Sequence, residues 1–136
     1  MAPSVVEELV VCDNACNDTT AISFSSFEKL KMLKVGDNCF VKVEELKLIG
    51  MKALESVTIG DYCFKGKNPS KNPDRRFYVK DCEQLKRLLI GYKSFSDCSV
   101  CEIENLPSLV TLTIGNKDSY SGNFSYASLE LKSDSQ

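Results

Sequence analysis

The stretch TIGDYCF, residues 58–64, decides the fold of this 136-residue chain because close variants of it recur along the sequence. They are KVGDNCF at 34–40, LIGYKSF at 89–95, TIGNKDS at 113–119 and, without the glycine, VVCDNAC at 10–16. The anchor of each phrase is its glycine or, in the earliest phrase, a cysteine. The anchors are Cys12, Gly36, Gly60, Gly91 and Gly115, which are 24, 24, 31 and 24 residues apart. Because a fixed period of this length is typical of repeat proteins, the sequence predicts five units of about 24 residues, starting near 6, 30, 54, 85 and 109.

Apolar residues occupy the same places in every unit. Three columns of equivalent residues are entirely aliphatic. They lie six residues before the anchor (Val6/Leu30/Leu54/Leu85/Leu109), three before it (Leu9/Leu33/Val57/Leu88/Leu112) and one before it (Val11/Val35/Ile59/Ile90/Ile114). The other half of the unit adds Ile22/Leu46/Phe77/Cys101 and Phe24/Leu48/Val79/Ile103, with mostly polar residues between the two columns. This alternation is the period-2 pattern of a half-buried strand, and one unit buries its apolar face only by stacking on its neighbours. The sequence therefore predicts a mainly β, single-domain solenoid over residues 1–136, with five coils, two parallel sheets and little helix.

The phrases also resemble a known repeat. LKMLKVGDNCF, LESVTIGDYCF and LKRLLIGYKSF resemble the LxxLxLxxNxL segment of leucine-rich repeats, and IGDYCF resembles the IGxxAF phrase of the surface-antigen type found in bacteria and protists. Cysteine or serine replaces the alanine of that phrase, and only Asn14 and Asn38 keep the asparagine, so no asparagine ladder is expected. The resemblance implies a rigid leucine-rich-repeat scaffold that binds other proteins and is not an enzyme.

Composition excludes several functions. The chain contains no histidine, which removes Ser-His-Asp and Cys-His catalysis and histidine-ligated metals. A net charge of -2 gives no bulk attraction for nucleic acid or an anionic membrane. No apolar run is long enough to span a bilayer, and no phosphate-binding glycine motif occurs. We therefore expect no enzyme activity, no cofactor, no metal, no nucleic-acid partner and no membrane span.

Seven cysteines need an explanation, and CSVC at 98–101 has the spacing of a metal or redox motif. The repeat favours another interpretation, because several cysteines take the places of core residues and behave there as small buried hydrophobes. A disulfide and a metal or redox centre are the alternatives, with Cys39 and Cys63 as the pair expected to lie closest. The odd number of cysteines and the absence of a signal peptide predict a reducing, cytoplasmic location, or a cell-surface or secreted one if a leader was removed.

Two irregular stretches are the candidate partner-binding sites. The first, 65–76, contains the seven-residue insertion and is predicted to be a basic loop carrying Lys65, Lys67, Lys71, Arg75 and Arg76. The second, 115–128, is predicted to emerge at the same edge and carries Tyr120, Phe124 and Tyr126, residue types enriched in interfaces. The alternatives are a solvated insertion for the first stretch and a cover over the last unit for the second.

Two functions follow from this pattern. The first is a non-enzymatic protein–protein interaction module that contacts an unidentified protein through loops 65–76 and 115–128. The outward face of the first sheet is a weaker alternative for that contact. The second function is a structural or assembly subunit that forms homo-oligomers, or docks, through the open ends of the solenoid, since unpaired sheet edges invite pairing.

Overall fold

Short strands form wherever the aliphatic columns alternate with polar residues. A computed structural model describes residues 5–18, 22–64, 72–91, 94–95, 98–115 and 128–132, with side chains undescribed at 72–75, 98–99 and 128–132. The described residues are mainly β with almost no helix. Their strands are β1 (Glu8–Val11), β2 (Met32–Val35), β3 (Glu45–Ile49), β4 (Ser56–Ile59), β5 (Asn72–Lys80), β6 (Arg87–Ile90), β7 (Cys98–Glu104), β8 (Thr111–Ile114) and β9 (Ser128–Lys132).

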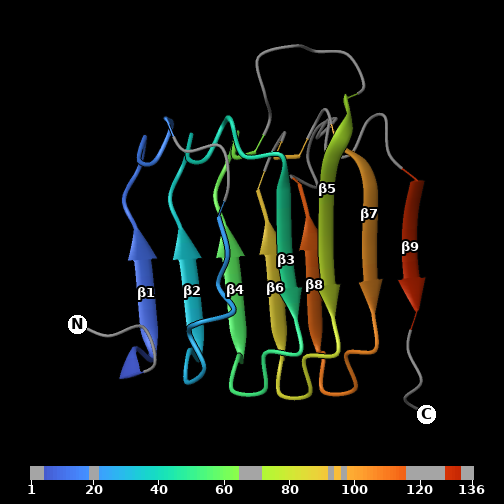
Figure 1. The fold of residues 1–136 in the computed structure, drawn as a ribbon. Coiled ribbons are helices and arrows are strands. Elements are labelled where there is room, and N and C mark those ends of the chain that lie inside the picture. Colours follow the sequence, from blue (N-terminus) through green and yellow to red (C-terminus); the bar gives the residue numbers. More distant parts are fainter. Residues whose placement is uncertain are drawn as a thin grey trace.

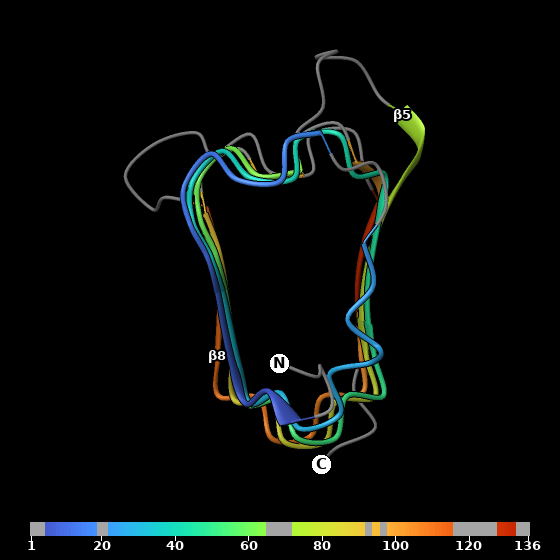
Figure 2. The same ribbon diagram turned by 60° about the vertical axis from the view of Figure 1, so that its left-hand side comes forward.

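The strands form two parallel sheets. Sheet A has the order β1-β2-β4-β6-β8, and sheet B has the order β3-β5-β7-β9 (Figure 1). Figure 2 shows the sheets as opposite walls joined by turns. Each strand of sheet A pairs with its equivalent in the next unit, as Leu33 does with Val57 and Val57 with Leu88. The columns Leu9/Leu33/Val57/Leu88/Leu112 and Val11/Val35/Ile59/Ile90/Ile114 are therefore confirmed as in-register pairs. The prediction of two parallel sheets with little helix is confirmed as well.

The core lies between the two sheets. Inward-facing aliphatic side chains of both sheets are buried there, and outward-facing neighbours are more exposed. Phe40, Phe64 and Phe95 stack along one corner, with ring centroids 5.3 Å and 4.7 Å apart in successive pairs. Phe77 of β5 stacks on Phe95 at 4.2 Å. All three corner phenylalanines have a positive φ of 51–60°, so the same local backbone recurs in each unit.

The anchor glycines are required because the units approach one another closely. A Cβ at Gly60 would lie 2.4 Å from Asp37 Oδ1 and 2.7 Å from the Gly36 carbonyl carbon. A Cβ at Gly91 would lie 2.5 Å from the Gly60 carbonyl carbon and oxygen. Carbon atoms pack favourably at about 3.5–4.0 Å, so a side chain at an anchor would push two units apart.

The two ends of the stack are less buried than its middle. Leu33, Val57 and Leu88 are at most 1 % exposed. Their equivalents Leu9 in β1 and Leu112 in β8 are only partly buried. Among the described residues, no further unit packs against the outer sides of β1 and β8, and this explains the difference.

Two segments differ from the prediction. Residues 22–24, predicted to be a strand because of their alternation, are not one, and sheet B begins at β3. Phe24 is nevertheless 2 % exposed and part of the core, so the alternation predicted burial correctly and backbone pairing wrongly. Residues 72–76, predicted to belong to loop 65–76, lie in β5, whose pairing with β7 shifts register between Asn72 and Arg76. None of the described residues belongs to a helix with the length and apolar character needed to cross a membrane.

Candidate interaction surface

Most of the predicted binding residues lie outside the described part of the chain. This holds for Lys65, Lys67, Lys71, Tyr120, Phe124 and Tyr126. Arg75 lies in β5, where only its backbone is described. Arg76 is exposed and pairs in register with Glu45 of β3 and Val100 of β7. The assignment of the two loops to partner binding stays a prediction.

A ladder of aspartates joins the first three units. The backbone N–H of Asp37 donates to Asp13 Oδ1 at 2.8 Å, and the N–H of Asp61 donates to Asp37 Oδ1 at the same distance. These aspartates directly follow the first three anchors. The sequence prediction concerned a different ladder, of asparagines two residues after the anchor. The recurrence of aspartate in CDN, GDN and GDY was the available signal. These side chains hold successive units in register.

A second ladder uses thiols and a hydroxyl. The Cys39 thiol donates to the Cys12 carbonyl at 3.0 Å, and the Cys63 thiol donates to the Gly36 carbonyl at 3.0 Å. In the next unit the Ser94 hydroxyl donates to the equivalent Gly60 carbonyl at 2.6 Å. The cysteine or serine that replaces the alanine of the IGxxAF phrase is therefore a buried donor to the preceding unit.

The buried cysteines have the properties of packed thiols rather than those of a reactive centre. Cys12, Cys16, Cys39, Cys63, Cys82 and Cys101 are not joined in disulfides, and no group of three or more metal-ligating side chains occurs among the described residues. Burial raises the pKa of the Cys63 thiol to about 12, and burial also raises the pKa values of Cys39 and Cys82. Buried protonated thiols are poor nucleophiles.

Two cysteines are exposed, although the cysteines were predicted to be buried. Cys12 and Cys16 are exposed. They belong to the first unit, and no described unit packs against its outer side. The side chain of Cys98 in the CSVC motif is not described, and Cys101 of that motif is buried.

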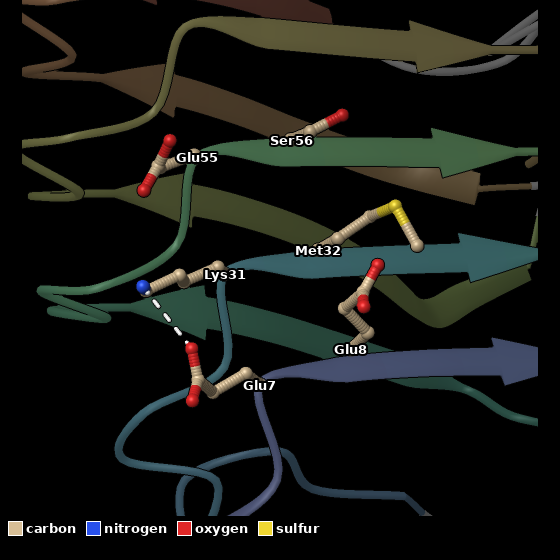
Figure 3. Close-up of a pocket in the computed structure, with 6 residues that line it drawn as sticks. All are labelled: Glu7, Glu8, Lys31, Met32, Glu55 and Ser56. Atoms are coloured by element: carbon tan, nitrogen blue, oxygen red, sulfur yellow. Dashed lines mark ion pairs between the residues drawn. The ribbon is translucent and has the colours of Figure 1, made fainter.

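A groove of about 460 Å³ opens where the strands of sheet A begin. Its lining residues come from three successive units and are Glu7, Glu8, Lys31, Met32, Glu55 and Ser56 (Figure 3). Glu8, Met32 and Ser56 are in-register neighbours on β1, β2 and β4. Glu7, Lys31 and Glu55 precede these strands and form a second row beside the first. The groove is thus built by equivalent places of the repeat.

Charges alternate along that second row. Lys31 Nζ lies 3.1 Å from Glu7 Oε1. The hydrogen bond to Glu7 and its charge raise the pKa of Lys31, and the charge of Glu55 acts in the same direction. Lys86 takes the equivalent place in the fourth unit. Val110, which is 83 % exposed, takes it in the fifth. Three carboxylates face one ammonium group in the groove, and Met32 adds a flexible apolar contact.

The outer face of sheet B carries a separate charge cluster. Lys80 of β5 pairs with Glu102 of β7, and its Nζ lies 3.9 Å from Glu104 Oε2. The same Nζ lies 5.1 Å from the centre of the Tyr78 ring. These contacts run between neighbouring residues on two paired strands and stabilise the sheet.

The comparisons with known proteins do not assign a family. The chain was compared with protein-family models, with curated proteins and with solved structures, and none of the three comparisons gave a match.

Proposed function

We propose that the chain is a non-enzymatic protein–protein interaction module built on a leucine-rich-repeat solenoid, closest to the surface-antigen type. Its support is the in-register pairing of equivalent residues from unit to unit in both sheets. The IGDYCF-like phrases lie at the ends of sheet A strands, and their phenylalanines stack in the core. Repeat proteins with such one-dimensional packing commonly use the extended surface as a binding site.

The contact surface in this proposal is the outer face of sheet A, centred on the groove. The single observation that carries it is that equivalent places in three units line one open groove, with Glu8, Met32 and Ser56 side by side. In-register pairing holds the backbone of these residues at fixed spacing, which lowers the ordering cost of binding. The excess of carboxylates favours a protein partner that presents basic side chains. Residues 65–76, whose last five lie in β5, and residues 115–128 are proposed as additional contacts.

Affinity capture with matched variants tests this proposal. The tagged chain, a Glu8→Lys/Ser56→Lys variant and a Lys47→Glu control on the outer face of sheet B are incubated with lysate, and retained proteins are identified by mass spectrometry. We expect at least one protein to be retained by the original chain and the control, to bind again when purified, and to be lost with the groove variant. Equal retention by all three would assign binding elsewhere, and deletion of 65–71 would then test the basic loop. If the original chain retains no protein specifically, the function itself is wrong.

A second candidate is an assembly subunit that docks through the ends of the stack. The incomplete burial of Leu9 in β1 and Leu112 in β8 favours it, because exposed aliphatic places at a sheet edge promote association. Light scattering over a wide concentration range separates the candidates: a constant monomer mass contradicts self-assembly through either end.

A further inference from the structure

The first unit has a cysteine where every later unit has its anchor glycine. This difference bears on whether another repeat unit can pair with the β1 edge of sheet A. The hydrogen bonding around Cys12 matches that around Gly36. The Cys12 carbonyl accepts the Cys39 thiol at 3.0 Å, just as the Gly36 carbonyl accepts the Cys63 thiol at 3.0 Å. Two residues after each anchor, Asn14 and Asn38 have φ values of 60° and 57°. The Cβ of Cys12 therefore points where a Cβ on Gly36 would point.

That direction leads into the space that a preceding unit would fill. A Cβ on Gly36 would lie 2.3 Å from Asp13 Oδ1 and 2.8 Å from the Asp13 backbone nitrogen. A Cβ on Gly60 or Gly91 would meet the backbone of its preceding unit at 2.5–2.8 Å. The obstruction involves backbone atoms in all three cases, so a different side chain in the preceding unit would not remove it. Cys12 itself is exposed, since no described unit occupies that space.

We infer that Cys12 closes the β1 edge of sheet A to in-register addition of another repeat unit, including the β8 end of a second copy. The backbone hydrogen bonding of the two edges is compatible in the described residues, because each anchor N–H donates to the preceding unit in the same way. Gly36 donates to Val11 at 2.8 Å, and Gly115 donates to Ile90 at 2.7 Å. With glycine at position 12, the described backbone of β8 in one molecule and of β1 in the next is matched for pairing as parallel strands of the same repeat.

This inference goes beyond the proposed function and limits its second candidate. Head-to-tail growth of identical chains into a filament is the general risk for a repeat with open ends. A side chain at one anchor blocks that growth while leaving the rest of the unit unchanged. A partner at the β1 end must consequently approach out of register, or contact the end without extending the sheet.

The test inserts one additional unit in front of the first. A copy of residues 30–53 is placed directly before Val6 in the full chain, in three versions: with Cys12 retained, with Cys12→Ala and with Cys12→Gly. The alanine version removes the thiol and keeps the Cβ, so it separates steric obstruction from cysteine chemistry. Urea unfolding reports both the midpoint and the m-value, and the m-value grows with the surface that unfolding exposes.

We expect the added unit to join the stack only with glycine at position 12. The m-value should then rise by about one fifth, in proportion to the number of stacked units, and the midpoint should rise with it. With cysteine or alanine at position 12, both values should stay at those of the original chain. The inference is overturned if the unit is incorporated equally in all three versions, or if the glycine version gains nothing over the alanine version.

Discussion

Substitution of a single anchor glycine tests the packing between units. In Gly60→Ala the new Cβ would lie 2.4 Å from Asp37 Oδ1 and 2.7–2.8 Å from the carbonyl atoms of Gly36. The φ of Gly60 is not in the left-handed region, so alanine fits the local backbone. Any destabilisation must therefore come from contact with the preceding unit.

The expected magnitude follows from three contributions. Overpacking of a close contact costs about 1–3 kcal/mol. Displacement of Asp37 weakens its 2.8 Å hydrogen bond from the Asp61 N–H, which costs about 1 kcal/mol more. Alanine also lowers the conformational entropy of the unfolded chain, which stabilises the folded state by about 0.4–1 kcal/mol. We expect Gly60→Ala to lower the free energy of unfolding by about 2–3 kcal/mol in urea denaturation.

Gly50→Ala is the matched control. Gly50 has a φ of 64° and no atom within 4 Å of an added Cβ, so only backbone strain opposes alanine there. Asp81 and Asn105 hold the equivalent places at φ 55° and 53°, which shows that the site accepts side chains. The left-handed conformation costs about 1–2 kcal/mol, partly offset by the same unfolded-state gain. Equal effects of the two substitutions, or a loss below about 0.5 kcal/mol for Gly60→Ala, would refute the close approach of the units.

Three further predictions concern the thiols. Cys63→Ser should cost less than about 1 kcal/mol in urea denaturation because serine keeps the donor to the preceding unit. Cys63→Ala should cost about 1–3 kcal/mol because it leaves the partly buried Gly36 carbonyl without this donor. Brief alkylation at pH 8 should label the exposed Cys12 and Cys16 long before Cys39, Cys63 and Cys82, as peptide mass spectrometry would report; early labelling of the buried thiols would contradict their raised pKa values. Stability should fall as pH rises from about 9 towards 12, because folded Cys63 keeps a proton, at a pKa of about 12, that the unfolded thiol loses near 9. The loss approaches about 4 kcal/mol at the upper limit, and a Cys63→Ser variant that unfolds with the same pH dependence would show that this thiol is not the cause.

The register of the sheets was predictable from the sequence because it follows from the period alone. Residues 24 positions apart, such as Leu33 and Val57, must meet if units stack, and they do. The insertion between Val57 and Leu88 does not disturb their pairing, since extra residues in a connection leave strand register unchanged. Columns of aliphatic residues were therefore sufficient to predict the core.

The alternation of apolar residues was less informative about backbone pairing. Phe24 is buried as predicted, yet residues 22–24 form no strand. Hydrophobic alternation reports which side chains face the core, whereas a strand also needs hydrogen bonds to a neighbouring backbone. The start of β5 at Asn72, within the predicted loop, is a similar case.

The polar contacts between units could not be derived from the repeat. Cys63 was predicted to be a small apolar residue, and burial agrees, but its thiol also donates to the Gly36 carbonyl. Likewise, aspartate recurs after the first three anchors, but the sequence does not show that Asp37 accepts a hydrogen bond from the next unit. Both roles depend on the offset between units, which residue type and spacing do not specify. The outward face of the first sheet, which carries Glu8, Met32 and Ser56, was predicted as a weaker alternative contact surface, but the groove on it was not predicted.

The contacts between units also restrict where a function can reside. Aspartate side chains accept hydrogen bonds from the following unit, and thiol or hydroxyl side chains donate to the preceding one. At the anchors Gly36, Gly60 and Gly91, a side chain would clash with the preceding unit. A change at these places is felt by two units at once, so they are unsuited to vary for recognition. Residues that face outward from sheet A, such as Glu8 and Ser56, carry no such constraint. Selection for a partner can therefore act on them without loss of the fold, and this is the physical reason to look for binding there.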